Sequence, residues 1–341
     1  MDKLPRIFNR YKPYIEEQLK SSLKPRQLPF YDMLRYHMGW VDSEGREIEA
    51  SGGKYLRATL CLLASESLSS DFKPALPLAE AIEYIHNFSL VHDDIQDNDL
   101  MRRHKPTVWS IWGKPQAINA GSAMRMVASL AVHKLNNYHI SCQRQMKAAS
   151  IMDRACLKMI EGQYLDISFE QKKTISLDDY LDMIEKKTAA LIEASLMMGA
   201  CLHTRGEKLE AFGMLGKNLG LAFQIKDDIL GIWGNDKKTG KSSGSDILKK
   251  KKSMPVVYLM ENAGPKISKS LTDIYNQDEI STKDKQIILS YLEQAGARQY
   301  CQEQADYYYL KSQQALEEIP LAGDTKKDYL EISEFLVKRE F

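Results

Sequence analysis

Residues 78–99, LAEAIEYIHNFSLVHDDIQDND, carry the strongest structural signal in this sequence. Apolar side chains recur there at positions 78, 81, 82, 85 and 88, which is the period of an α-helix with one buried face. The apolar stripe leads directly into acidic residues that begin at Asp93. The stretch therefore predicts a core helix with carboxylates at its C-terminal end.

The rest of the sequence has the same helical character. No proline, which would break a helix interior, occurs between Pro115 and Pro255. Ser176, followed by two aspartates, predicts a capped helix start, and Lys187 and Thr188 fall within that helix. Polar and glycine-containing stretches predict loops at residues 39–53, 103–121, 231–253 and 264–269. No strand pattern is present, so we expect an all-α, single-domain helical bundle.

The composition excludes several classes of function. Among 341 residues, 47 Lys and Arg balance 46 Asp and Glu, and a net charge of +1 gives no overall field that would attract nucleic acid. No apolar run reaches the ~18 to 20 residues that cross a bilayer, and charges interrupt the N-terminal stretch where a signal peptide needs an apolar core. The five widely spaced cysteines favour free thiols. We expect a cytoplasmic protein with no nucleic-acid partner and no integral membrane segment.

The first acidic cluster is His92-Asp93-Asp94-Ile95-Gln96-Asp97-Asn98-Asp99, at the end of the apolar helix. On a helix, Asp93 and Asp97 stand one turn apart on the same face, where their carboxylates repel each other unless a cation lies between them. Mg²⁺ prefers oxygen ligands and shares its coordination shell with substrate phosphates. The cluster therefore indicates a Mg²⁺ site, and the alternative is a solvated helix end with surface acids.

A second acidic pair, Asp227-Asp228, follows the mostly apolar stretch 215–223, and Gln224 shares a helix face with Asp228. Acid pairs at the ends of two helices can converge across a bundle, where buried charges need counter-ions. Metal ions that bridge a diphosphate would supply them. The alternative is that Asp227 and Asp228 are ordinary acidic residues on the protein surface.

Cationic residues accompany both clusters. Arg102 and Arg103 follow the first one, and Lys54 and Arg57, three residues apart, face one way if their segment is helical. Arginine's planar guanidinium suits phosphate oxygens, and lysine adds a point charge. Further candidates are Lys187, Lys241, Lys251 and His86. Each alone is more simply a surface charge or a core histidine, so the prediction rests on their occurring together.

Two acid clusters and a separate set of cations could hold two diphosphates, one as a metal-bound leaving group and one bound by cations alone. This arrangement suits ionisation of an allylic diphosphate and attack of an alkene on the cation.

From about residue 45 to the C-terminus, the sequence resembles the trans-isoprenyl diphosphate synthases of the polyprenyl synthetase family. Residues 1–44 are expected to form an N-terminal helical extension of the same single domain, 1–341. The motifs, in the family's order, are Gly52-Gly53-Lys54-x-x-Arg57; Asp93-Asp94-x-x-Asp97 with Arg102-Arg103 and Lys105-Pro106-Thr107; Gly162-Gln163-x-x-Asp166; Lys187-Thr188-Ala189-Ala190-Leu191; Phe223-Gln224-Ile225-x-Asp227-Asp228; and Gly240-Lys241 with Asp246-Ile247-x-x-x-Lys251.

The resemblance implies the isoprenoid synthase type I fold, a bundle around a deep central cavity, usually in a homodimer. It implies small-molecule isoprenoid diphosphates as substrates, three Mg²⁺ ions per site, and the leaving diphosphate as the base. The residues that would coordinate Mg²⁺ are Asp93, Asp94, Asp97, Asp227 and Asp228. Those that would bind isopentenyl diphosphate are Lys54, Arg57, His86 and Arg103. Those that would surround the allylic diphosphate and assist catalysis are Arg102, Lys187, Thr188, Gln224, Lys241 and Lys251.

The sequence departs from the family's pattern at four positions. Gly231 stands where the family often has the third acid of the second cluster, which is expected to weaken metal binding without abolishing it. His104 replaces a usual glycine, Ala58 a proline and Ser122 an aspartate. Together these residues indicate a divergent branch.

Product length is expected to depend on the residues one and two turns before the first cluster, Phe88, Ser89, Tyr84 and Ile85. A bulky aromatic residue five positions before the first aspartate, beside a small residue, resembles the pattern of enzymes that make C20 products. Phe88 and Ser89 fit this pattern, so geranylgeranyl diphosphate is the expected product. If Phe88 is ordinary core packing, C15 or C25 products remain open.

Two other functions share parts of this pattern. A class I terpene synthase has the fold and the first acidic cluster, but it does not need the site for isopentenyl diphosphate. A non-catalytic partner subunit would keep the fold and modify a catalytic chain, and Gly231 is the feature in its favour. The leading hypothesis is a Mg²⁺-dependent prenyltransferase that joins isopentenyl diphosphate to an allylic diphosphate.

Overall fold

The computed structural model describes residues 4–48, 53–172, 174–234, 244–321 and 324–338. Its α-helices are α1 (Arg6–Leu23), α2 (Phe30–Met38), α3 (Leu56–Ser69), α4 (Leu76–Gln96), α5 (Val108–Trp112), α6 (Lys114–His133), α7 (Cys142–Gln171), α8 (Leu177–Ile184), α9 (Ala190–Cys201), α10 (Glu207–Trp233), α12 (Ser245–Leu248), α13 (Met254–Asn262), α14 (Pro265–Tyr275), α15 (Thr282–Gln294), α16 (Ala297–Glu317) and α17 (Thr325–Lys338). Shorter helical segments are the 3₁₀ turns η1 (Lys73–Ala75) and η2 (Lys134–Tyr138) and the π-helix η3 (Glu185–Ala189). Within the described residues, the only strands are β1 (Met101–Arg102) and β2 (Lys105–Pro106), which pair antiparallel. The predicted all-α fold is confirmed.

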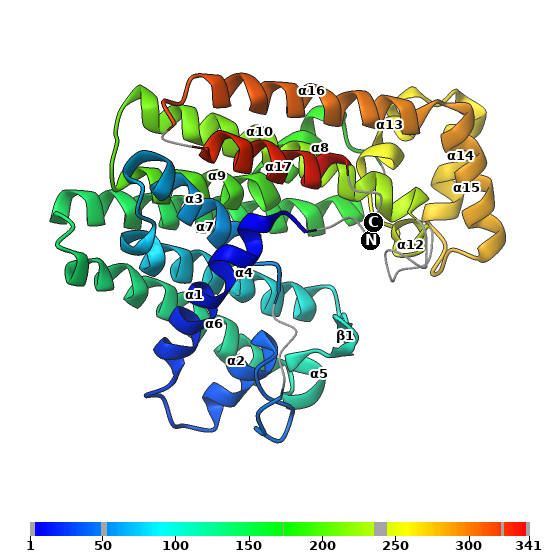
Figure 1. The fold of residues 1–341 in the computed structure, drawn as a ribbon. Helices are drawn as coiled ribbons and strands as arrows, with labels where there is room; N and C mark the ends of the chain where they lie inside the picture. The colour runs from blue at the N-terminus through cyan, green and yellow to red at the C-terminus, as the bar shows by residue number, and fades with distance from the viewer. Residues whose placement is uncertain (1–3, 49–52, 173, 235–243, 322–323, 339–341) are drawn as a thin grey trace.

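Helix α4 is the predicted core helix, and Ile82, Ile85 and Phe88 of its apolar stripe are buried. It packs against α3 and α6, whereas α10 packs against α9 and α16. Figure 1 shows the long helices α7, α9, α10 and α16 lying side by side across the molecule. The acidic ends of α4 and α10 are thereby held in one bundle.

Both ends of the chain contribute to the largest hydrophobic core. Tyr11 of α1 and Tyr329 of α17 are fully buried in the same cluster of side chains. Leu336 of α17 belongs to this cluster too. The first and last helices therefore support the bundle that carries the site. None of the described helices combines the length and the apolar character needed to cross a bilayer.

The helix predicted after Ser176 is divided into α8, η3 and α9. Ser176 caps α8 as expected, because its Oγ accepts a hydrogen bond from the backbone N of Asp179 at 3.1 Å. The π-helical turn η3 then carries Lys187 and Thr188. A Cβ on Gly162 of α7 would lie 2.3 Å from the backbone N of Lys187, so only glycine lets α7 approach this turn. Such turns are rare and are frequent at functional sites.

Two of the predicted loops are largely helical, and those predictions are wrong. Residues 103–121 include β2, α5 and the start of α6, and residues 265–269 begin α14. Pro115 and Pro265 fall in the first turns of α6 and α14. Proline is favourable there because the first amides of a helix have no partner within it. These prolines mark helix starts rather than loops.

Candidate active site

The first acidic cluster lies at the C-terminal end of α4. Asp93 is half-buried, and the backbone N of Asp97 donates to the carbonyl O of Asp93 at 2.8 Å, so the two residues remain one helical turn apart. Burial raises the pKa of Asp93 to about 6; the positive charge of Lys187 opposes this rise and the negative charge of Asp97 adds to it. Lys187 interacts electrostatically with both carboxylates. Asp93 and Asp97 therefore share one environment, as their spacing predicted.

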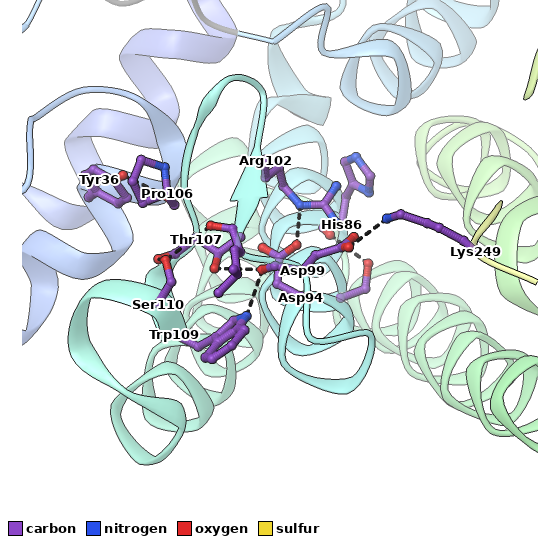
Figure 2. A network of polar contacts seen from close by, with 12 residues as sticks. Tyr36, His86, Asp94, Asp99, Arg102, Pro106, Thr107, Trp109, Ser110 and Lys249 are labelled. Atoms are coloured by element: carbon purple, nitrogen blue, oxygen red, sulfur yellow. Dashed lines mark hydrogen bonds and ion pairs between the residues drawn. The ribbon is translucent and has the colours of Figure 1, made fainter. Parts of the chain in front are cut away.

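Asp94, the middle acid of this cluster, forms an ion pair with Arg102. Its side chain is 1% exposed, and the Nε of Arg102 donates to its Oδ1 at 2.7 Å, as Figure 2 shows. Burial raises the pKa of Asp94 to about 6 against the opposing effect of Arg102. Its Oδ2 is buried and has no hydrogen-bond partner among the described residues. Asp94 thus holds Arg102 at the edge of the site.

A short hairpin carries the two arginines that follow this cluster. Arg102 pairs with Lys105 across β1 and β2, and Arg103 and His104 form its turn with φ angles of 50° and 64°. Left-handed backbone favours glycine, so His104 occupies a position at which glycine would be less strained. The hairpin is fastened to α2, because the Nζ of Lys105 donates to the carbonyl O of Tyr36 at 2.6 Å.

Polar contacts join η3 to its neighbours on both sides. The Nζ of Lys187 donates to the Oδ2 of Asp166 on α7. Burial lowers the pKa of Lys187, but Asp166 and then Asp93 more than compensate, so the net shift is upward and the ammonium stays charged. On the other side, the Oγ1 of Thr188 donates to the Oε1 of Gln224 at 2.8 Å. Lys187, Thr188 and Gln224 are therefore brought together, as the motifs implied.

In the second acidic cluster, Asp228 accepts three hydrogen bonds. Its carboxylate accepts hydrogen bonds from the hydroxyl of Tyr180, from the Nε2 of Gln224 at 2.9 Å and from the backbone N of Met254 at 2.8 Å. Burial raises the pKa of Asp228 to about 7 despite these donors, and the charge of Asp246 adds to the rise. These hydrogen bonds tie α8, α10 and α13 together at Asp228, and a metal-binding role for this carboxylate stays a prediction.

The four residues expected to bind isopentenyl diphosphate do come together. Lys54, Arg57, His86 and Arg103 line one cavity of about 440 Å³ between α3, α4 and the hairpin. Lys54 precedes α3 instead of lying on it, because Tyr55 has a φ of +50° and the helix begins at Leu56. Lys54 and Arg57 therefore come together as lining residues of this cavity, and not as neighbours on one face of a helix.

Arg57 and His86, both half-buried, lie in contact within this cavity. The Nη1 of Arg57 lies 3.3 Å from the Nε2 of His86. Burial lowers the pKa of His86 well below its ordinary value, and the positive charges of Arg57 and Arg103 add to this effect. A neutral His86 can still donate a hydrogen bond to a phosphate oxygen, while the arginines supply the positive charge.

Glu83 was missed by the sequence analysis although it lines this cationic cavity. Its Oε1 accepts a hydrogen bond from the backbone N of Ala58 at 3.1 Å, in the first turn of α3. Burial raises the pKa of Glu83, and the Ala58 amide, Arg57 and Arg103 oppose the rise. Its position three residues before His86, on one helix face, is the signal that could have identified it.

A family model described as Polyprenyl synthetase matches residues 39–292. This chain belongs to the polyprenyl synthetase family. It is 33% identical over 327 residues to a (2E,6E)-farnesyl diphosphate synthase of Mycobacterium tuberculosis, a match that covers 95% of this chain and 89% of the relative. It is 33% identical over 293 residues to a geranylfarnesyl diphosphate synthase of Aeropyrum pernix, with 85% and 91% covered. The crystal structure of a geranylgeranyl pyrophosphate synthetase from Pyrococcus horikoshii has a TM-score of 0.88 at 34% identity, over 98% of both chains.

The predicted enzyme class is therefore confirmed, because this polyprenyl synthetase is a trans-prenyltransferase of the isoprenyl diphosphate synthase type. The names of its relatives include farnesyl, geranylgeranyl and geranylfarnesyl diphosphate synthases. Product length varies among proteins of similar identity to this chain, so it must be argued from individual side chains.

Polyprenyl synthetases are generally Mg²⁺-dependent, and the side chains fit such an ion. Asp93 and Asp97 offer carboxylate oxygens on one face, and the Oδ2 of Asp94 is buried without a partner among the described residues. Across the described ranges, no three His, Cys, Asp or Glu side chains are gathered into a ready ion cage. Mg²⁺ suits this arrangement because it takes one or two carboxylates and completes its shell with water and substrate phosphates.

The lysine run 249–252 reaches the first acidic cluster from α12. The Nζ of Lys249 donates to the Oδ1 of Asp99 at 2.7 Å, which links the two segments in Figure 2. Lys251 lines a small cavity together with Asp97 and Asp166. Lys251 of this polyprenyl synthetase thus lies beside two acids of the candidate site, and its role toward the allylic diphosphate stays a prediction. Lys241 lies outside the described residues.

The four residues expected to control chain length are not equivalent. Ile85 is fully buried, and the ring of Phe88 packs edge-on against His92 with centroids 4.9 Å apart. The Oγ of Ser89 donates to the carbonyl O of His86 at 2.8 Å. The hydroxyl of Tyr84 donates instead to the carbonyl O of Leu19 on α1 at 2.8 Å. Tyr84 therefore fixes α1 to α4, whereas Phe88 and Ser89 lie within about one turn of the acids.

Proposed function

We propose that this enzyme condenses isopentenyl diphosphate with an allylic diphosphate (dimethylallyl, geranyl or farnesyl), and that its product is geranylgeranyl diphosphate (C20). The observation that carries the proposal is the cavity in which Lys54, Arg57, His86 and Arg103 gather. A terpene synthase has one diphosphate to bind and no use for this second cationic site. A non-catalytic partner subunit would not need it either.

The chain's own residues then divide between the two diphosphates. Mg²⁺, three ions per site, would be held by the acidic clusters and would withdraw charge from the leaving diphosphate when bound. Lys187, oriented by Asp166, and Arg102, oriented by Asp94, place positive charge around that group. Lys251 adds a further charge from the lysine run.

The reaction needs no protein nucleophile. The allylic C–O bond breaks with its electron pair on the diphosphate, and the alkene of isopentenyl diphosphate attacks the allylic carbon to form the new C–C bond. Loss of a proton to the released diphosphate regenerates an allylic product. The hydroxyl of Thr188 and the amide of Gln224, which bond to each other, offer dipoles beside the developing cation.

The direct test supplies purified protein with Mg²⁺, labelled isopentenyl diphosphate and C5, C10 or C15 allylic diphosphates in separate reactions, and sizes the dephosphorylated products. A discrete C20 product is expected. A C15 or C25 product would support the condensation reaction but contradict the assignment of a C20 product. No incorporation from any primer by folded protein would favour the terpene synthase or partner-subunit alternatives.

Phe88 supports the C20 assignment because it is bulky and buried close to the first acidic cluster. Phe88→Ala should open space for further condensations and shift the main product to at least C25. Product chromatography after a long incubation measures this. Tyr84→Phe is the matched control, since it removes only a hydroxyl bonded to α1 and should leave the product unchanged. An unchanged product from folded Phe88→Ala would make Phe88 ordinary core packing.

We also propose a homodimer that uses the exposed faces of α6 and α7, which lie in contact. The large exposed hydrophobic side chains of these helices are Ile118, Met126 and Leu130 on α6 and Met146, Leu157, Ile160 and Tyr164 on α7. The exposed fraction is 58% for Leu157 and 71% for Tyr164, and exposed apolar side chains gathered on two contacting helices favour a protein interface. Packing of the N- and C-terminal helices in one core supports a single domain, 1–341, in each subunit.

Ile160→Glu should shift the protein from dimer to monomer, because the new carboxylate would be buried without a partner in the interface. Light scattering coupled to gel filtration measures the mass. Leu310→Glu is the matched control, since Leu310 is equally apolar and 58% exposed but lies on α16. A dimer that survives Ile160→Glu at micromolar concentration would contradict this interface.

A further inference from the structure

Residues 249–252, four lysines, form a tight turn between α12 and α13. The backbone N of Lys250 donates to the carbonyl O of Ile247 at 2.9 Å. The backbone N of Lys251 donates to the carbonyl O of Asp246, also at 2.9 Å. Lys250 has a φ of 54°, the left-handed conformation with which this pair of hydrogen bonds ends many helices. The backbone of the lysine turn is therefore held by its own hydrogen bonds.

Lys249 anchors the lysine turn to the first acidic cluster. Its Nζ donates to the Oδ1 of Asp99 at 2.7 Å, as Figure 2 shows. The carbonyl O of Asp99 in turn accepts hydrogen bonds from the Oγ1 of Thr107 and the Nε1 of Trp109, both at 2.9 Å. The backbone N of Asp99 donates to the carbonyl O of Asp94 at 3.0 Å. Lys249 thus binds a residue whose own position is fixed on two sides.

Lys252 anchors the lysine turn to α7. Its Nζ donates to the carbonyl oxygens of Phe169 and Lys172. Because α7 ends at Gln171, its last carbonyls have no partner within the helix, and a cation there also meets the negative end of the helix dipole. Phe169 follows Asp166 by three residues on α7. Lys252 therefore holds the lysine turn within about one helical turn of the acid that orients Lys187.

Lys251, between these two anchors, lies beside the acids of the candidate site. It lines a small cavity with Asp97, Asp166 and Glu170. Burial raises the pKa of Glu170, Asp166 and Asp97 add to the rise, and the positive charge of Lys251 opposes it. Within the part of the chain that the structure describes, the ammonium of Lys251 forms no hydrogen bond and no ion pair. This ammonium is therefore available to a further anion.

We propose that Lys249 and Lys252 are positioning residues, which hold the ammonium of Lys251 where the allylic diphosphate binds. This inference rests on the proposed function, because it assumes that Lys251 meets that diphosphate. Neither Lys249 nor Lys252 belongs to the motifs that the chain shares with its family. Each acts through its own contact, Lys249 on Asp99 and Lys252 on α7, so the loss of either leaves the lysine turn fastened toward the site on one side only.

Lys250 allows positioning to be separated from the simple effect of charge. It belongs to the same turn, but its Nζ donates to the carbonyl O of Gln277, between α14 and α15. Removing Lys250 lowers the local positive charge as much as removing Lys249 does. It leaves the contacts with Asp99 and with α7 in place, so Lys250→Met is the matched control.

The experiment uses the thiolo analogue of geranyl diphosphate, in which sulfur replaces the bridging oxygen and slows ionisation. Calorimetry with Mg²⁺ measures its affinity for each full-length protein. Lys249→Met and Lys252→Met should each bind it about tenfold more weakly, whereas Lys250→Met and the charge-conserving Lys249→Arg should stay within about twofold of the native affinity. The KM for isopentenyl diphosphate should be unchanged in all four variants.

If the two anchors act through Lys251, their effects must depend on it. Lys251→Met alone should weaken binding by about tenfold or more. Adding Lys249→Met or Lys252→Met to Lys251→Met should then change the affinity by no more than about twofold, because the group that they position is already gone. Thermal unfolding of each variant shows that it is folded.

Native affinity in either Lys249→Met or Lys252→Met would overturn the inference. Equal weakening in Lys250→Met would overturn it too, because total charge alone would then decide the affinity. A further tenfold loss in the double variants would mean that the anchors act directly or through the fold, and not through Lys251.

Product formation by the native protein is measured separately, so that a failure of the proposed function is recognised by itself. A native protein that bound the analogue but formed no product would contradict the condensation, and the comparison of variants would still decide the positioning roles. A native protein that did not bind the analogue would overturn both proposals.

Discussion

Asp93→Ala is expected to abolish product formation, with kcat/KM for the allylic diphosphate falling by about a thousandfold or more. Asp93 is the half-buried carboxylate that shares its environment with Asp97 and Lys187. Without it, Asp97 alone faces the leaving diphosphate on this side, and the ammonium of Lys187 loses one of the charges that hold it. The loss should therefore appear in the chemical step and not only in substrate affinity.

Incorporation of labelled isopentenyl diphosphate at saturating Mg²⁺ measures this loss, and single-turnover kinetics separate chemistry from product release. Asp278→Ala is the matched control, since it removes an exposed carboxylate far from the acidic clusters in sequence and should keep native activity. Unaltered turnover in Asp93→Ala would mean that the first acidic cluster is not the metal–diphosphate site, and it would defeat the prenyltransferase and terpene synthase mechanisms together.

Arg57→Gln is expected to raise the KM for isopentenyl diphosphate by roughly a hundredfold, the equivalent of one or two lost charge-assisted hydrogen bonds. The KM for the allylic diphosphate should change little, because Arg57 lies in the separate cationic cavity. Removing Arg57 leaves the buried carboxyl of Glu83 without the larger of the two positive charges, Arg57 and Arg103, that oppose the rise of its pKa. The double variant Arg57→Gln with Glu83→Gln removes both charges and distinguishes lost substrate binding from lost folding.

Initial rates with one diphosphate varied at saturating concentration of the other give the two KM values. Arg46→Gln is the matched control, because Arg46 is 68% exposed and forms its ion pairs with Asp42 and Glu44 on the surface. If both KM values rose equally in the folded double variant, the cavity would not be a separate site for isopentenyl diphosphate.

The sequence predicted the fold well wherever one periodic stripe determined a helix. Helix α4 is buried as its spacing required, and the serine at position 176 caps α8. The predictions failed at residues 103–121 and 264–269, where proline and glycine were interpreted as loop signals. Proline is equally compatible with the first turn of a helix, so composition alone could not decide between the two.

The motifs predicted much of the candidate site, but they did not predict which partner each acidic side chain contacts. Spacing correctly grouped Asp93 with Asp97, yet adjacency in sequence gave no sign that Asp94 turns to Arg102 or that Asp228 turns to Tyr180 on α8. These outcomes depend on which helix packs against each side of α4 and α10. A single sequence does not contain that information in any local pattern.

The family match at residues 39–292 is shorter than the set of elements that build the site. Tyr36 of α2 holds the hairpin that presents Arg102 and Arg103, and Phe335 and Leu336 of α17 line the cationic cavity. The set of helices that builds the site is therefore wider than the segment that the family model matches. Substitutions in α2 or α17 offer a route to reshaping the cationic cavity without changing any residue of the motifs.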